Sequence, residues 1–204
     1  YSHPGTTTMN HLSGLDATFL HLETPETPMH VGGLSILELA SDYTGNFIDD
    51  VRAHIQSRMH LAPIFQRKLV NIPFDLANPV WVVDEYLDID HHLRHVIVPP
   101  PADRATVDRV VSRLHSSLLD RSRPLWEMYV LEGLPVPADA PKGTRYIGLY
   151  SKFHHAALDG MGGQGRDADG VAVGRGLGHQ VDADVAAAAG PVLDHDRAQA
   201  VLDA

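Results

Sequence analysis

The chain has 204 residues, no cysteine and a formal net charge of -10, and 44% of its residues are hydrophobic. This composition is typical of a globular protein, and it excludes disulfides, thiolate metal sites and cysteine nucleophiles. The acidic balance argues against nucleic-acid binding, because neutralising phosphates requires clustered Lys and Arg. The first residues lack the features of a signal peptide and no apolar run could span a bilayer, so we expect an intracellular protein.

The chain changes character after about residue 164. Every aromatic residue lies at or before Phe153, and the segment 165–204 is rich in Ala, Asp and Gly. Repeated glycines disfavour a helix there by about 1 kcal/mol each relative to alanine. We therefore predict a folded domain over residues 9–164 and a low-complexity, poorly packed tail over 165–204. An out-of-frame translation of a GC-rich gene is one explanation of this tail, and a genuine low-complexity segment is the other.

The predicted elements begin with a strand over residues 29–39, followed by an amphipathic helix. Asn46 is a favourable N-cap residue for this helix. Its apolar face is formed by Ile48, Val51, Ile55 and Met59. This stripe predicts that the helix packs against the core. Two further strands, over residues 79–84 and 93–99, are bounded by Pro, Asn or Asp.

A second helix, more strongly amphipathic, begins near Asp103. Its apolar stripe consists of Val107, Val110, Val111, Leu114 and Leu118. Strands over residues 125–134 and 144–155 follow. On the last strand one predicted face carries Ile147, Leu149, Ser151 and Phe153, and the other carries Tyr146, Gly148, Tyr150 and Lys152. The mixture predicts an α/β or α+β layered domain, and both helical stripes are interpreted as core rather than as cofactor contacts.

The end of the last predicted strand carries two histidines, His154 and His155, followed by Asp159 and Gly160. Neighbouring side chains on a strand point to opposite sides of the sheet, so only one of the two imidazoles can face a given pocket. Neutral histidine accepts protons near neutral pH, because its unperturbed pKa is about 6.5. Asp159 and Gly160 suit a tight turn. These residues alone leave open that the histidines simply end a strand and that Asp-Gly forms an ordinary turn.

Two other patterns are weaker candidates for binding sites. Residues 160–165, GMGGQG, formally match a dinucleotide-binding glycine motif, but no convincing strand and helix flank them. His91 and His95 have the spacing of metal ligands only on a helix, whereas their segment favours a strand. We therefore expect no metal site and no cofactor, and a metal-dependent hydrolase is the weakest of the functions considered.

The sequence HHAALDG at residues 154–160 resembles the H-H-x-x-x-D-G motif of acyl-CoA-dependent acyltransferases with the chloramphenicol acetyltransferase-like fold. Segments 12–38, 73–84 and 123–134 are similar, in the same order, to landmarks of bacterial wax ester synthase/diacylglycerol acyltransferases of the actinobacterial triacylglycerol synthase type. The resemblance covers about residues 12–163. It implies a two-layer α/β domain that forms the N-terminal half of a two-domain enzyme.

The resemblance also implies roles for particular residues. His155 would be the general base that takes the proton of an alcohol while its oxygen attacks the acyl-CoA thioester, without an acyl-enzyme. His154 and Asp159 would support His155. Substrate binding would involve Gly160 and the P-L-W residues, the latter either as a wall of the acyl channel or as a structural brace: Pro124, Leu125 and Trp126.

The implied substrates are long-chain acyl-CoA, as a co-substrate, and either diacylglycerol or a fatty alcohol. Such an enzyme would be cytoplasmic and bound peripherally to the inner face of the membrane or to lipid droplets, with a complementary C-terminal half as a further partner. The alternative is a truncated, non-catalytic half-enzyme that binds lipid or pairs with a second half.

Overall fold

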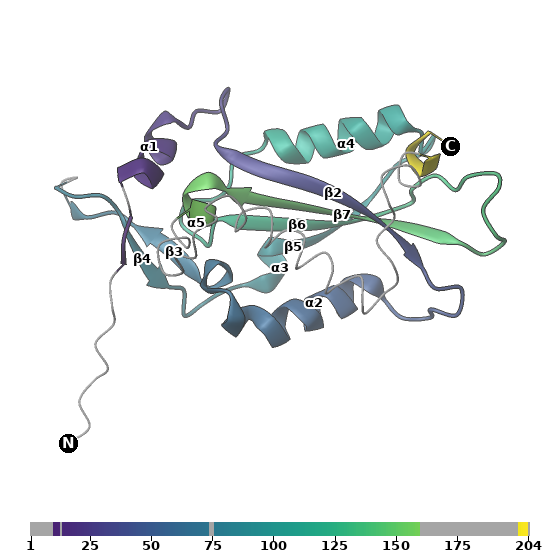
Figure 1. Cartoon of the computed structure of the whole chain (residues 1–204), viewed down its shortest axis with the longest axis horizontal. Helices are drawn as coiled ribbons and strands as arrows, with labels where there is room; N and C mark the ends of the chain where they lie inside the picture. The colour runs from purple at the N-terminus through teal and green to yellow at the C-terminus, as the bar shows by residue number, and fades with distance from the viewer. Residues whose placement is uncertain (1–9, 13, 74–75, 160–199, 204) are drawn as a thin grey trace, which may run out of the picture.

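The computed structural model describes residues 10–12, 14–73, 76–159 and 200–203 of the chain. Its centre is a four-stranded sheet with the strand order β2-β7-β6-β5 (Figure 1). The strands are β2 (His30–Leu39), β5 (Leu93–Ile97), β6 (Trp126–Glu132) and β7 (Arg145–His154). β7 pairs antiparallel with both β2 and β6, whereas β5 pairs parallel with β6. All four correspond to predicted strands.

Helices cover both faces of this sheet. α4 (Arg104–Ser116) lies along one face and α2 (Phe47–Arg58) along the other (Figure 1). The alternation of side chains along β7 explains the arrangement, because Tyr150 belongs to the apolar cluster that contains α4, and Leu149 to the cluster that contains α2. The predicted division of β7 into two faces is therefore confirmed, and both faces are buried.

A second sheet of three strands, in the order β1-β4-β3, extends from one end of the body (Figure 1). It consists of β1 (Asn10–His11), β3 (Arg67–Val70) and β4 (Val80–Val83). The sequence predicts β4 but not the other two strands. β3 has a single buried residue, Leu69, so its apolar pattern is too short to identify a strand.

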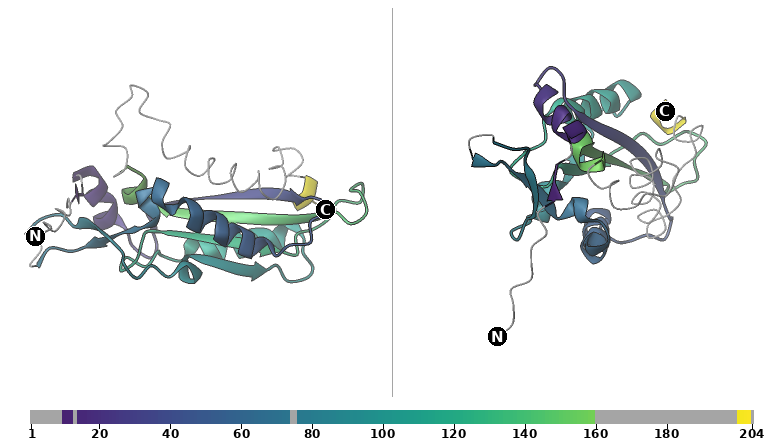
Figure 2. Two further views of the ribbon diagram at one scale, coloured as in Figure 1. Left: turned by 90° about the horizontal axis from the view of Figure 1, so that it is seen from below. Right: turned by 60° about the vertical axis from the view of Figure 1, so that its left-hand side comes forward.

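The remaining helical segments were not predicted as such, and two of them begin at residues assigned to other elements: Met59 follows the end of α2, and His155 follows the end of β7. They are α1 (Gly14–Leu22), the 3-10 turns η1 (Met59–Leu61) and η2 (Pro63–Phe65), α3 (Ile89–His92) and α5 (His155–Asp159). α1 and α5 lie side by side at the end of the central sheet where β7 finishes (Figure 2). Helix formation at residue 155 ends β7 one residue before the predicted limit.

The two predicted helices start where expected but differ in their caps and ends. The Asp103 carboxylate accepts a hydrogen bond from the Thr106 backbone N–H at 2.8 Å, which is the expected N-cap interaction. Asn46 occupies the N-cap position of α2 in an extended conformation, but its side chain makes no cap hydrogen bond. α4 ends at Ser116, so the prediction that Leu118 continues the buried stripe is wrong, and Leu118 is 37% exposed.

The segment predicted as a poorly packed tail is described only at its end. Val201 is fully buried in the apolar cluster on the α4 face, and Asp203 Oδ1 lies 3.2 Å from Arg104 Nη1. Residues 1–9 and 160–199 lie outside the described residues. The division at residue 164 and the two explanations of the tail therefore remain predictions.

Two adjacent glycines of β2, Gly32 and Gly33, differ sharply in their surroundings. A Cβ atom on Gly32 would lie 2.4 Å from the hydroxyl of Tyr150, whereas one on Gly33 would meet nothing within 4 Å. The Tyr150 ring is buried and its hydroxyl lies 2.7 Å from His115 Nδ1, so moving it breaks that contact.

We expect Gly32→Ala to lower the free energy of unfolding by about 1–3 kcal/mol, because it overpacks this region. Gly33→Ala serves as the matched control and should leave the stability unchanged or slightly higher. Urea denaturation of both variants measures the difference, and equal effects would show that Tyr150 does not restrict position 32.

Candidate active site

The predicted histidine pair lies where β7 ends and α5 begins. His154 is the last residue of β7 and is completely buried, whereas His155 is the first residue of α5 and is partly exposed. The expectation that both residues belong to the strand is wrong, because the chain turns into a helix between them. The two rings nevertheless differ in access, so a substrate can reach His155 but not His154.

His155 is held by two segments from the N-terminal part of the chain. Its backbone N–H donates a 2.9 Å hydrogen bond to the carbonyl oxygen of Met29, immediately before β2. Its ring stacks on Phe19 of α1, with ring centroids 4.9 Å apart and planes inclined by 18°. Neither contact uses a ring nitrogen.

His154 is a buried, neutral histidine. Its Nδ1 accepts a 3.1 Å hydrogen bond from the Ala156 backbone N–H, which places the ring proton on Nε2. Nε2 lies 3.3 Å from Oε1 of Glu23, without the geometry of a hydrogen bond. Burial lowers the pKa of His154 to about 4, against the opposing effect of the Glu23 charge. Burial and the lowered pKa make His154 a poor proton acceptor, which suits a supporting residue rather than a general base.

Two further charged residues, Glu23 and Arg121, lie beside His154. Neither of them was predicted from the sequence as a site residue. The Glu23 side chain is 1% exposed, and its Oε2 lies 2.7 Å from Nη2 and 3.1 Å from Nε of Arg121. Its Oε1 accepts a 3.1 Å hydrogen bond from the Met29 N–H. Burial raises the pKa of Glu23, but these hydrogen bonds and the nearby positive charge outweigh it, so the pKa lies below its usual value. Glu23 is thus a buried carboxylate anion.

Stability should depend on pH through His154. Its pKa is 6.5 in the unfolded reference and about 4 in the folded protein. Between these values the unfolded chain binds more protons, so this contribution is complete above about pH 6.5 and is lost as the pH falls toward 4. One proton corresponds to a slope of at most about 1.4 kcal/mol per pH unit. Burial also lowers the pKa values of His30, His91 and His92, which adds slopes of the same sign.

We expect His154→Gln to reduce the pH dependence of the unfolding free energy by up to that one-proton slope. Urea denaturation at several pH values between 4.5 and 6.5 measures it in both proteins. A slope identical to that of the unmodified chain would mean that His154 protonates as easily when folded as when unfolded.

The predicted P-L-W residues are all buried: Pro124, Leu125 and Trp126. The Trp126 ring stacks on His92 at 4.4 Å and meets Phe65 edge-on at 4.9 Å, and its Nε1–H donates to the Phe65 carbonyl. The Leu125 carbonyl accepts a 3.1 Å hydrogen bond from the His154 backbone N–H, which joins this segment to the histidine motif. These contacts support the role of a brace, while contact with substrate stays a prediction.

The remaining residues of the predicted motif are placed only in part. Asp159 closes α5, but its side chain, Gly160 and the glycine-rich pattern over 160–165 lie outside the described residues. Their predicted roles therefore stay predictions. The rest of α5 is anchored in the core by its buried residues: Ala156, Ala157 and Leu158.

The weaker candidate, a metal site at His91 and His95, lies on elements other than those of the histidine pair. His91 belongs to α3 and His95 to β5, so the two do not share a helical turn. Within the described ranges, no group of three or more His, Cys, Asp or Glu side chains is arranged to hold a metal ion. No helix in those same ranges has the length and apolar character needed to cross a membrane.

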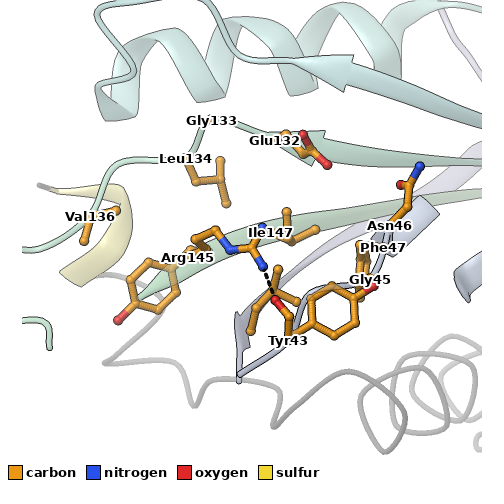
Figure 3. Close-up of a pocket in the computed structure, with 12 residues that line it drawn as sticks. Tyr43, Gly45, Asn46, Phe47, Glu132, Gly133, Leu134, Val136, Arg145 and Ile147 are labelled. Atoms are coloured by element: carbon orange, nitrogen blue, oxygen red, sulfur yellow. Dashed lines mark hydrogen bonds between the residues drawn. The ribbon is translucent and has the colours of Figure 1, made fainter. Parts of the chain in front are cut away.

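A pocket of about 400 Å³ lies at the opposite end of the sheet, where β2 ends and β7 begins (Figure 3). Arg145 lies along it and donates a 2.7 Å hydrogen bond to the Tyr43 carbonyl. Among the residues that the structure describes, no histidine lines this pocket. It is therefore separate from the site at His155.

Comparison with known proteins connects these features to one family. The model of the wax ester synthase/diacylglycerol acyltransferase catalytic domain matches residues 12–167. Two Mycobacterium tuberculosis proteins that carry the name diacylglycerol O-acyltransferase are 36% and 38% identical over 146 and 160 residues, which is 72% and 78% of this chain. The chain spans about 30% of the length of these relatives.

Solved structures agree with the sequence matches. The wax ester synthase/diacylglycerol acyltransferase from Marinobacter aquaeolei VT8 is similar with a TM-score of 0.59 and 35% identity, over 74% of this chain and 34% of that protein. The starter condensation domain of rhizomide synthetase reaches a TM-score of 0.56 at 13% identity, over 88% of this chain and 38% of that one. The second likeness concerns the fold alone. Together they confirm the expected α/β, chloramphenicol acetyltransferase-like fold.

Proposed function

Because the chain belongs to the wax ester synthase/diacylglycerol acyltransferase family, we propose that it supplies the histidine-bearing half of an acyl-CoA-dependent O-acyltransferase. Its substrates are long-chain acyl-CoA and either diacylglycerol or a fatty alcohol, and its product is triacylglycerol or a wax ester. The observation that supports this proposal most directly is the accessible imidazole of His155, fixed between α1 and β2 beside a buried, neutral His154.

In the proposed reaction His155 accepts the proton of the alcohol hydroxyl while that oxygen attacks the thioester carbonyl. The tetrahedral intermediate then collapses, the carbon–sulfur bond breaks, and the departing CoA sulfur receives the proton from His155. Transfer is direct, without an acyl-enzyme. General-base catalysis of this kind contributes about 10²–10⁴-fold to a rate.

Other residues of the motif act through His155 in this proposal. His154 and Asp159 support it, and the buried P-L-W segment braces the end of β7 through the Leu125 carbonyl. Donors for the oxyanion and the walls that position both substrates are also needed. We assign them largely to a complementary C-terminal half, since the chain spans about 30% of its relatives' length. The lipid substrates place the enzyme peripherally at the cytoplasmic face of a membrane or on lipid droplets.

The test is an acyl-transfer assay with labelled long-chain acyl-CoA and either diacylglycerol or fatty alcohol. The chain is assayed by itself and together with the C-terminal region of the Marinobacter enzyme. Labelled triacylglycerol or wax ester, formed in either mixture and absent without this chain, is the expected result. Absence of product in both mixtures, together with no binding of acyl-CoA by calorimetry, would overturn the proposal.

The alternative expected from the sequence is a non-catalytic half-enzyme. It predicts binding of acyl-CoA or lipid without turnover, whether or not the C-terminal region is added. The same assay and calorimetry therefore separate the two functions.

A further inference from the structure

Glu23 lies at the centre of the contacts around His155, although it does not touch that ring. Its buried carboxylate reaches three groups: the Met29 backbone N–H at 3.1 Å, the Arg121 guanidinium at 2.7 and 3.1 Å, and His154 Nε2 at 3.3 Å. Glu23 itself directly follows α1. One carboxylate thus joins four parts of the chain that meet at the histidine site.

Two connections lead from Glu23 to His155. The Met29 N–H donates a hydrogen bond to the Glu23 carboxylate, and the Met29 carbonyl accepts the N–H of His155. Phe19, which stacks on the His155 ring, lies one helical turn before Glu23. Displacing Glu23 would therefore move both the backbone anchor and the ring support of His155.

The third contact fixes the state of His154. The carboxylate charge faces the Nε2–H of this ring, which favours the tautomer whose Nδ1 accepts the Ala156 N–H at the start of α5. The opposite tautomer would place an N–H against the Ala156 N–H and remove that hydrogen bond. The charge of Glu23 is thereby coupled to the first turn of the helix that begins at His155.

Arg121 compensates the buried charge of Glu23 and connects this residue to α1. Its guanidinium pairs with Glu23 through two nitrogens and also donates a 2.7 Å hydrogen bond to the Leu20 carbonyl near the end of α1. A buried carboxylate is stable only with such partners. The Glu23 end of the pair is buried, whereas the Arg121 side chain is 45% exposed and reaches it from the surface.

We propose that Glu23 is a positioning residue for His155, which it orients through Met29, through α1 and through the tautomer of His154. The catalytic consequence rests on the proposed acyl-transfer function, whereas the structural coupling does not. Glu23 takes no part in bond making, since its carboxylate is buried and contacts Met29, Arg121 and His154 rather than the His155 ring.

The test compares Glu23→Gln with Glu26→Gln, an exposed glutamate three residues later. Histidine-labelled protein reports the tautomer of His154 by NMR, and amide hydrogen exchange reports the hydrogen bond between His155 and Met29. In Glu23→Gln we expect a mixture of His154 tautomers and about tenfold faster exchange of the His155 amide. Glu26→Gln should match the unmodified chain in both readouts.

The catalytic arm uses the acyl-transfer assay. Loss of positioning should lower kcat by about 10- to 100-fold and leave KM for acyl-CoA nearly unchanged. Glu23→Asp, which keeps the charge on a shorter stem, should recover part of kcat.

The outcomes separate the two proposals. An unchanged His154 tautomer and unchanged His155 exchange in Glu23→Gln would overturn the positioning role, whatever the activity. Inactivity of the unmodified chain in every mixture would count against the function and leave the NMR result standing. If circular dichroism shows that Glu23→Gln is unfolded, Glu23→Asp takes its place in the NMR comparison, and unchanged exchange there again overturns the proposal.

Discussion

Replacing His155 with alanine should reduce acyl transfer by about 10²–10⁴-fold, the contribution expected of a general base. The ring is partly exposed and contacts the protein mainly by stacking on Phe19. The variant should therefore fold normally, and its backbone hydrogen bond to Met29 should persist. The measurement is kcat with labelled acyl-CoA and diacylglycerol, in whichever mixture the unmodified chain is active.

The matched control is His21→Ala, an exposed histidine on α1. It should retain full activity, and both variants should unfold at similar urea concentrations. Product formation by His155→Ala at the rate of the unmodified chain would refute the general-base role. A large loss of stability in His155→Ala would instead assign the residue to folding.

The central sheet could be predicted from the sequence because its strands carry strong local signals. β6 and β7 are dominated by apolar and aromatic residues between Pro, Gly and Asp, and β2 shows the same pattern. The boundary between His154 and His155 could not be predicted in this way. The strand pattern continues up to the histidines, and no local signal marks the point at which the helix begins.

The surroundings of His155 were much less predictable than the residue itself. Glu23 and Arg121 are 98 positions apart, so no local spacing connects them. Charged residues are mostly exposed, and nothing in the sequence distinguishes Glu23 from Glu26. The α4 stripe shows a related limit, since periodicity identified the helix but not its end at Ser116.

The C-terminal end of α4 contacts Lys152, a charged side chain buried in the core. Lys152 is completely buried on β7, and its Nζ donates 2.9 Å hydrogen bonds to the carbonyls of Leu114 and Ser117. The same ammonium lies 3.0 Å from Oε2 of Glu127, which also accepts a 2.7 Å hydrogen bond from Tyr129. Burial lowers the pKa of Lys152, against the opposing effect of Glu127. One side chain thus caps a helix and neutralises a buried carboxylate.

Lys152→Met should therefore lower the free energy of unfolding by about 1–3 kcal/mol, because the Leu114 and Ser117 carbonyls lose their donor. Glu127 loses its ammonium partner as well but keeps Arg94, whose Nη2 lies 3.3 Å from Oε1. A loss of that size is a large part of the total stability of a domain, typically about 5–15 kcal/mol. Adding Glu127→Leu should restore part of it, since an apolar pair needs no compensating charge. Lys142→Met, at an exposed lysine in the loop before β7, is the control and should change little. Urea denaturation of the four proteins measures their free energies of unfolding. A loss below about 1 kcal/mol for Lys152→Met would show that the Lys152 cation is not needed to balance the charge of Glu127.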